Sequence, residues 1–158
     1  MALPDESPIA IRPAVLQDLD RLVEIDAECF PAGIAYPREE IAALLVAPSV
    51  LTVVAEKAGA IAGFAALGWS RRRGARYGEL ITIDILPQFR REGVGWQLHE
   101  ELERWLRAGD GASIHLHVSI ANTAAINFYQ RLGYRTTARI PRYYLGRIDA
   151  WRMEKALF

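Results

Sequence analysis

Cysteine is nearly absent from this sequence, which contains only Cys29 among 158 residues. A single cysteine excludes an intramolecular disulfide and fits a reducing compartment, so we expect a cytoplasmic protein. Lysine is also scarce, since Lys57 and Lys155 are the only two. No apolar run reaches membrane-spanning length, and residues 1–13 lack the charged start and apolar stretch of a secretory signal. We therefore expect no membrane partner.

The formal net charge is zero as well, because 19 basic residues balance 19 acidic ones. Such a chain has no overall attraction to nucleic acid, so we expect no nucleic-acid partner and only local phosphate recognition. Apolar residues make up 51% of the sequence, and its length is enough for a buried core. These properties predict a single globular domain over residues 1–158.

Hydrophobic periodicity and turn residues predict a mixed α/β fold. The polar run at 70–76 is expected to be a loop, and so is the segment at 141–147 between the last two strands. The expected helices are residues 15–29, 38–46, about 94–107 and 122–133. The expected strands are residues 9–13, 49–56, 60–70, 77–86, 113–119, 134–140 and 148–157.

The segment RREGVG, residues 90–95, joins a predicted strand to the helix that follows it. A helix N-terminus presents free backbone N–H groups and a partial positive charge, which together attract phosphate. Gly93 and Gly95 would let a ligand approach the backbone, and Arg90 and Arg91 would add positive charge. A plain turn with solvated arginines explains the segment equally well. The segment matches neither the P-loop nor the dinucleotide-binding glycine pattern.

RREGVG also matches the Q/R-x-x-G-x-G/A signature of the GCN5-related N-acetyltransferases, at the same strand-to-helix junction. The segment LHVSIANTAAINFYQRLGY, residues 116–134, resembles a later part of the same family. The resemblance covers about residues 8–156. It implies a mostly antiparallel mixed sheet of about seven strands with four helices. A central parallel pair, 77–86 and 113–119, would splay apart to hold acetyl-CoA.

The resemblance also implies which residues hold this cosubstrate. The pyrophosphate would lie on the backbone N–H groups of residues 91–96, and Asn122 would bind the pantetheine arm besides capping its helix. No metal is expected. The expected acetyl-CoA-binding residues are Ile83, Ile85, Arg90, Arg91, Glu92, Gly93, Val94, Gly95, Trp96 and Asn122.

Two residues compete for the role of general base. By the strand period of two, Glu79 shares a face with Ile81, Ile83 and Ile85, and apolar neighbours would raise the pKa of its carboxyl toward a useful range. It also falls where histone-acetylating members of the family have a catalytic glutamate. The alternative is a solvated residue at the strand end.

His117 is the rival base, because histidine titrates near neutrality. It resembles the histidine of an LHV segment that acts as base in some N-terminal acetyltransferases. Those members have tyrosine where this sequence has Glu79, so their paired arrangement is not reproduced. A half-buried structural histidine is the alternative for His117, and His115 is expected to be structural.

Tyr129 lies about two turns into the helix that begins at Asn122. In the family the matching tyrosine protonates the leaving thiolate. A tyrosine pKa near 10 lies just above that of a typical thiol, so this transfer is reasonable. The alternative is a tyrosine that only packs its helix on the sheet.

Two further segments, RYYLGR at 142–147 and CFPAGIAYP at 29–37, resemble the acceptor site of the N-terminal and ribosomal-protein alanine acetyltransferases. The adjacent tyrosines of the first segment would hold the backbone of a peptide. The second segment, a loop after the first helix, would shape the pocket for the first side chain of that peptide. The alternative for the pair is a hairpin anchor. The expected acceptor-binding residues are Phe30, Pro31, Tyr36, Tyr143 and Tyr144.

The cost of deprotonation favours an α-amine as the acceptor. At pH 7 an α-amino group with a pKa near 8 costs about 1.4 kcal/mol to deprotonate, whereas a lysine side chain costs nearly 5 kcal/mol. We therefore expect an N-acetyltransferase for peptide or protein N-termini. The acidic segments 5–7 and 26–28 leave an enzyme for small cationic amines or antibiotics as the alternative. A non-catalytic acetyl-CoA-binding module is a further one.

A homodimer is also possible from the sequence. The last strand, at 148–157, and an exposed tryptophan, Trp69 or Trp151, could serve an interface between two copies.

Overall fold

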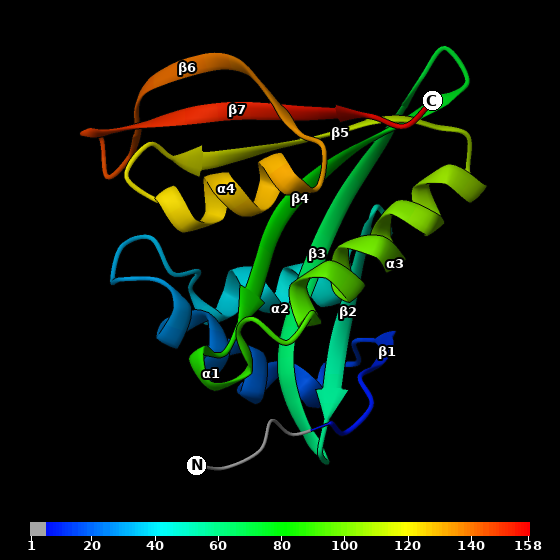
Figure 1. The fold of residues 1–158 in the computed structure, drawn as a ribbon, viewed down its shortest axis with the longest axis vertical. Helices are drawn as coiled ribbons and strands as arrows, with labels where there is room; N and C mark the ends of the chain where they lie inside the picture. Colours follow the sequence, from blue (N-terminus) through cyan, green and yellow to red (C-terminus); the bar gives the residue numbers. More distant parts are fainter. Residues whose placement is uncertain (1–5) are drawn as a thin grey trace.

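A computed structural model describes residues 6–158 and contains one sheet with strand order β1-β2-β3-β4-β5-β7-β6 (Figure 1). Every neighbouring pair is antiparallel except β4 and β5, which are parallel. The mostly antiparallel mixed sheet predicted from the sequence is therefore confirmed. The strands are β1 (Ala10–Pro13), β2 (Val50–Lys57), β3 (Ala60–Arg72), β4 (Ala75–Ile85), β5 (Gly111–Ser119), β6 (Arg135–Tyr144) and β7 (Ile148–Ala156).

Helices cover both faces of this sheet (Figure 1). Short 3-10 turns at Leu16–Asp18 and Pro87–Phe89 precede α1 and follow β4. None of the helices within residues 6–158 is long and apolar enough to cross a membrane. The four α-helices are α1 (Leu19–Cys29), α2 (Arg38–Val46), α3 (Val94–Ala108) and α4 (Thr123–Arg131).

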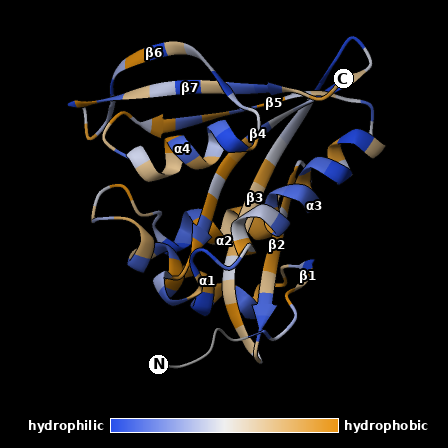
Figure 2. Cartoon of the chain, viewed as in Figure 1, coloured by the Kyte–Doolittle hydropathy of each residue, from blue (hydrophilic) through white to orange (hydrophobic). Residues whose placement is uncertain are grey.

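The apolar side chains form two cores, one on each face of the sheet. Figure 2 shows the apolar residues concentrated along the central strands. In the larger core α3 and α4 pack on the sheet, and Leu98, Leu102 and Leu106, which recur every four residues along α3, are fully buried. In the smaller core α1 and α2 pack on β2 and β3 around Phe64 and Ile25. The sheet is thus buried on both sides over its centre, which explains the nearly continuous apolar runs of β2 and β3.

The parallel pair β4 and β5 is joined only over its first residues. Pairing begins at Arg76 with Gly111 and ends at Glu79 with His115. Beyond that point β4 continues downward beside β3, while β5 turns away to pair with β7 (Figure 1). The expected splay of the two central strands is therefore present, and it begins at Glu79.

A bulge in β4 falls at the start of this splay. Ala66 of β3 pairs with Thr82, but the next residue, Leu67, pairs with Leu80, so Ile81 is the extra residue. Such an insertion changes which face the following side chains occupy. Ile83 consequently packs on the larger core. Glu79 lies on the opposite face together with Ile81, because Glu79 pairs with Gly68 and the Ile81 side chain lies over Gly68 on that face. The prediction that Glu79 shares a face with Ile83 and Ile85 is therefore wrong.

The polar run at 70–76 is mostly strand rather than the expected loop. β3 extends to Arg72 and β4 begins at Ala75, and the turn residues Arg73 and Gly74 have φ angles of 52° and 81°. The Arg76 guanidinium lies 4.7 Å from the ring centre of Trp69 and 4.5 Å from that of Trp105. Trp69 of β3 and Trp105 of α3 thus hold Arg76 and support the extended hairpin.

The segment at 141–147 is likewise not a loop throughout. β6 continues to Tyr144, with an irregular register between Ile140 and Tyr144 and a φ of 55° at Arg142. Only a tight turn at 145–147 separates it from β7.

The surfaces expected for a dimer are also corrected. Strand β7 lies between β5 and β6, so its edges are already paired. Trp69 and Trp151 are partly buried against the larger core, and Arg139 covers Trp151. The exposed tryptophan is Trp96. Self-association stays a prediction, with β6 as the outer strand at this end of the sheet.

Replacement of Leu102 by alanine should destabilise the protein strongly, because this side chain is fully buried between α3 and the sheet. Such a cavity costs about 3 kcal/mol of unfolding free energy. Leu16→Ala is the control, since Leu16 is 58% exposed and its loss should change stability by less than about 0.5 kcal/mol. Urea unfolding of both variants measures the difference, and equal stabilities would contradict the assignment of this core.

Candidate active site

The bend between β4 and α3 has the backbone geometry of an anion site. Gly93 precedes the helix with a φ of 85°, and Arg91 has a φ of 65°. The first helical hydrogen bond runs from the Gln97 N–H to the Gly93 carbonyl, at 3.1 Å. The N–H groups of Val94, Gly95 and Trp96 therefore precede the intrahelical ladder, and no side chain of the described residues caps this end. Free N–H groups and the helix dipole together suit a phosphate.

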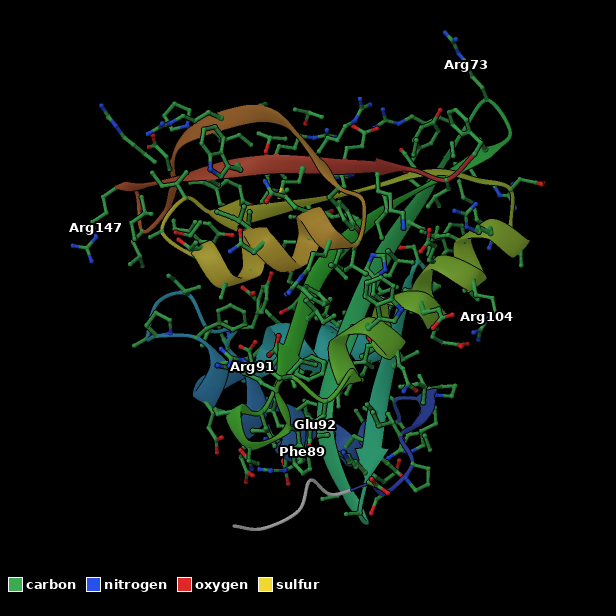
Figure 3. All side chains as sticks on the ribbon, viewed as in Figure 1. Arg73, Phe89, Arg91, Glu92, Arg104 and Arg147 are labelled. Carbon is green, nitrogen blue, oxygen red and sulfur yellow. The ribbon has the colours of Figure 1, made fainter. Side chains whose placement is uncertain are left out.

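The three side chains before Gly93 have different surroundings. The Arg90 guanidinium donates to the Ile85 carbonyl at 3.0 Å, so it turns back toward the end of β4. Arg91 is exposed and lies at the bend, where Figure 3 labels it with Glu92. Glu92 is 3.4 Å from Lys57, a side chain only 4% exposed at the end of β2. Glu92 thus anchors the bend to the sheet, and Arg91 is the residue of the three best placed to meet a phosphate.

The two glycines of the bend serve different needs. A Cβ on Gly93 would meet nothing within 4 Å, so its positive φ is the reason for glycine there. A Cβ on Gly95 would come within 3.1 Å of Phe128 in α4. Gly95 therefore lets α4 pack closely on the start of α3, a function that the sequence pattern did not reveal.

The splay of β4 and β5 leaves a pocket of about 490 Å³. Its walls come from β4, β5, the start of α4, and the segment that follows α1. Many of the predicted residues line it, but Glu79, Ile85, Tyr143 and residues 90–96 do not. The lining residues are Cys29, Phe30, Pro31, Ile34, Tyr36, Leu80, Ile81, Thr82, Ile83, His117, Val118, Ser119, Ala121, Asn122, Ala125, Tyr129, Tyr144 and Ile148.

His117 lines this pocket on β5, two residues beyond the last pairing with β4. Its ring stacks on Tyr143 with centres 4.8 Å apart and planes at 20°. Partial burial, and then the neighbouring His115, lower the pKa of His117 below its usual value of 6.5. The imidazole is therefore neutral at physiological pH and able to accept a proton.

Glu79 is exposed at the mouth of the splay, opposite His115. Its negative charge raises the pKa of His117, although burial outweighs that effect and lowers it overall. Glu79 is therefore close enough to influence His117, and the apolar surroundings expected for Glu79 are not found.

Tyr129 is 9% exposed and lines the pocket on α4. Burial raises the pKa of its phenol well above the usual value of 10, so the hydroxyl stays protonated through the neutral range. A protonated hydroxyl at the pocket is what a donor to a leaving thiolate requires. The raised pKa makes this phenol a weaker acid than a tyrosine with the usual pKa near 10, so complete proton transfer to the thiolate costs more.

Asn122 caps α4, because its side-chain oxygen accepts a hydrogen bond from the Ala125 N–H at 3.2 Å. The predicted cap is therefore confirmed. The same side chain lines the pocket, so it is accessible to a pantetheine arm.

Aromatic and apolar side chains from two segments distant in sequence line the part of the pocket that is expected to bind the acceptor. Phe30, Pro31 and Tyr36 follow α1, and Tyr144 ends β6. The Tyr144 hydroxyl donates to the His117 carbonyl at 3.2 Å, while Tyr143 lies outside the lining and covers the His117 ring.

Sequence reasoning missed several residues at the pocket. Thr82 lines it and donates to Asp84, a carboxyl on the buried face of β4. Ile34 and Ile148 are apolar wall residues without any motif. Lys57, which holds the bend through Glu92, gave one signal only, its rarity as one of two lysines.

The splayed parallel pair, the uncapped helix N-terminus and the pocket between them define a protein that binds a phosphate-bearing cosubstrate along a gap in its sheet. The sequence profile of the acetyltransferase (GNAT) family matches residues 19–134, and the chain belongs to this family. Among the described residues, no group of His, Cys, Asp or Glu could hold a metal ion.

Known relatives cover nearly the whole chain. An N-alpha-acetyltransferase of Sulfurisphaera tokodaii is 27% identical, over 93% of this chain and 92% of its own. The N-alpha-acetyltransferase RimI of Mycobacterium tuberculosis is 27% identical, over 96% of this chain and 94% of its own. The crystal structure of Ard1 from Thermoplasma volcanium is similar with a TM-score of 0.82 at 25% identity, covering 95% and 98% of the two chains.

A solved structure of the same fold contains acetyl-CoA. NAA60 of Arabidopsis thaliana in complex with acetyl-CoA is similar with a TM-score of 0.83 at 20% identity, covering 94% of this chain and 98% of that one. The chain is thus an acetyl-CoA-dependent N-acetyltransferase that transfers acetyl groups to amines. Acetyl-CoA fits the residues present, because Gly93 opens a cradle of free N–H groups and Asn122 and Tyr129 line the splay.

Gly93→Ala should weaken acetyl-CoA binding about tenfold, because a left-handed conformation costs alanine about 1–2 kcal/mol and the strained bend would relax. Gly74→Ala is a matched control, since Gly74 also has a positive φ (81°) with nothing near its missing Cβ, but lies in the β3–β4 turn. Both variants should lose similar stability. Calorimetric titration with acetyl-CoA measures the difference, and equal affinities would contradict the proposed phosphate site.

Proposed function

We propose that this enzyme acetylates the N-terminal α-amine of peptides or proteins. The observation that carries the proposal is the chemistry of the pocket, whose lining contains no acidic residue among those described. A site for a polyamine or an aminoglycoside needs carboxylates for several positive charges. Apolar walls with a few hydroxyls instead suit one amine attached to a neutral peptide end.

The acidic segments that favoured a small cationic acceptor do not contribute to this pocket. Asp26 is fully buried beneath it, and Glu28 is exposed on α1 outside the lining. Segment 5–7 begins outside the described residues, and Glu6 is exposed and likewise outside the lining. The alternative therefore loses the feature on which it rested.

The names of the relatives support the same acceptor class, since two of them are N-alpha-acetyltransferases. A structure of Naa50 from Arabidopsis thaliana, similar in fold with a TM-score of 0.82, holds the bisubstrate analogue CoA-Ac-MVNAL. That analogue joins coenzyme A to a peptide, which is the arrangement proposed for the two ends of this pocket.

The chain's residues can manage the protons of this transfer. Bound acetyl-CoA supplies the thioester, whose carbon–sulfur bond breaks as the bond to the amine nitrogen forms. His117, neutral and beside the acceptor end, receives the amine proton directly or through a water. Tyr129 donates a hydrogen bond, and finally a proton, to the departing sulfur. Glu79 acts electrostatically by raising the pKa of His117.

The pH profile distinguishes the two candidate bases. If His117 is the base, kcat/KM falls on acidification with an apparent pKa below about 6.5, since the lowered pKa keeps the base neutral to lower pH. His117→Gln should remove this limb and most of the activity. Glu79→Gln should shift the limb to lower pH, because the charge that raises the pKa of His117 is gone. The reverse pattern, with activity abolished in Glu79→Gln and the limb intact in His117→Gln, would assign the base to Glu79.

A substrate panel tests the acceptor class. Thiol release and intact mass should show acetylation of peptide N-termini and none of polyamines, aminoglycosides or N-terminally blocked, lysine-containing peptides. Tyr129→Phe should lower kcat with little change in peptide KM. Turnover of polyamines alone would establish the small-amine alternative. Acetyl-CoA binding without turnover of any amine would establish the non-catalytic module.

A further inference from the structure

Two aspartates lie buried beneath the acceptor end of the pocket, outside the machinery described so far. Asp26 of α1 is 0% exposed and Asp84 of β4 is 1% exposed. Both lie beside the smaller core, whose apolar residues include Ile25 and Leu86. No ion pair to either aspartate is present within residues 6–158. Two isolated charges at such a place would be very costly.

The hydrogen bonds of these carboxyls leave one oxygen of each unsatisfied. Asp26 Oδ2 accepts from the Tyr36 N–H at 2.6 Å, and Asp84 Oδ1 accepts from the Thr82 hydroxyl at 2.5 Å. Asp26 Oδ1 and Asp84 Oδ2 are buried and have no donor among the described residues. The two carboxyls are neighbours, because Asp26 raises the pKa of Asp84 and both aspartates raise the pKa of Cys29. Two ionised carboxylates have no donor between them, whereas a single proton on one of them would supply that donor.

We propose that Asp26 and Asp84 share a single proton, and that this carboxyl pair positions the acceptor wall of the pocket against β4. One proton would satisfy both orphaned oxygens and leave one buried negative charge instead of two. The positioning role rests on the acceptor site proposed above, whereas the shared proton does not.

The elements that the pair joins are the two sides of the acceptor pocket. Asp26 holds the backbone of Tyr36, which lines the pocket and whose hydroxyl donates to the Ile81 carbonyl at 3.4 Å. Thr82, the donor to Asp84, lines the pocket from β4. Cys29, one turn after Asp26, contacts the Ile85 carbonyl at 3.4 Å. Loss of the shared proton would place two like charges between these walls and separate them.

The groups around the pair decide how its proton responds to pH. Burial, and then Asp26, raise the pKa of Asp84 well above its usual range, while Thr82 and Arg90 lower it. Burial, and then Asp84, raise the pKa of Cys29 to about 11, and burial raises the pKa of Tyr36 to about 12, so these neighbours stay neutral. Tyr129, from α4, also senses the Asp84 charge.

Because the pKa of Asp84 is higher in the folded than in the unfolded state, the direction of its effect on stability with pH is fixed. The stabilisation from the proton is fully present below the unfolded pKa of aspartate, near 4, and is lost as the pH rises through the folded pKa. The contribution of this pair to thermal stability should therefore decrease as the pH rises through its folded pKa, and the acceptor wall should loosen in the same interval.

Asp84→Asn tests the shared proton, because an amide supplies a permanent donor to Asp26. The thermal midpoint of this variant should change less with rising pH than that of the wild type. Infrared spectra should show a protonated carboxyl band in the wild type at neutral pH, and this band should be missing in Asp84→Asn. A wild type without the band, or equal pH dependence of the two midpoints, would overturn the shared proton whatever the substrate of the enzyme.

Acceptor kinetics test the positioning role with whichever amine the enzyme turns over. Asp84→Ala should raise the acceptor KM about tenfold, the effect of losing a hydrogen bond to a charged partner, and leave the acetyl-CoA KM unchanged. Asp84→Asn should restore the acceptor KM. At each pH the wild type is compared with Asp84→Asn, which cancels the titration of the amine itself.

Asp18→Asn is the control for general destabilisation. Asp18 is also a buried aspartate, but it pairs with Arg12 at 2.9 Å, and neither residue lines the pocket. The hydrogen bond from Arg12 lowers the pKa of Asp18, so the stability it contributes is lost on acidification, opposite in sign to the pair. This variant should lose stability without any change in acceptor KM. An equal rise of the acceptor and acetyl-CoA KM values in Asp84→Ala, or a raised acceptor KM in Asp18→Asn, would overturn the positioning role.

Discussion

The parting of β4 from β5 after Glu79 and His115 is the constraint on which the rest of the molecule depends. A parallel pair normally continues its hydrogen bonds, and strands that separate leave backbone groups in need of other partners. Here β4 keeps β3 on one side and β5 keeps β7, so each strand remains held at one edge. The gap between them therefore persists as a binding site instead of collapsing.

The two helices on the larger core complete the site from opposite ends. Helix α3 begins a short loop after the end of β4 and offers its free N–H groups there, while Asn122 and Tyr129 come from the N-cap and the body of α4 (Figure 1). The acceptor end is built differently, from the segment after α1 and the irregular end of β6. One end thus depends on helix packing and the other on loops, which is where differences in acceptor preference are expected to arise.

Much of the fold followed from local patterns in the sequence. The leucine spacing of α3, the cap at Asn122 and the glycine bend each act over a few residues, and all three are present. The Ile81 bulge did not follow, because an inserted residue leaves the apolar character of β4 unchanged. The hairpin at Arg73 was not predicted because its arginine-rich composition resembles a loop, and one of the two tryptophans that stack on Arg76, Trp105, is distant in sequence. The pairing of Asp26 with Asp84 joins residues that no local pattern connects.

The roles of His117 and Tyr129 in acetyl transfer were predicted from resemblance to a family more than from the physical properties of the residues. His117 and Tyr129 are brought to one pocket, as expected, but the exposure of Glu79 depends on where the strands separate. Burial also changes the pKa values of these groups in ways that residue type alone does not reveal. The lowered pKa of His117 and the raised pKa of Tyr129 both result from their surroundings.

The contact between Gly95 and Phe128 has an evolutionary consequence. Because a Cβ at position 95 would lie 3.1 Å from the Phe128 ring, an alanine there requires a smaller or displaced side chain at position 128. The two positions are separated by the whole of α3 and β5, yet substitutions at them should be accepted together and rarely alone. The family signature, which allows glycine or alanine at the first of these positions, is thereby linked to the identity of a residue beside the tyrosine on α4.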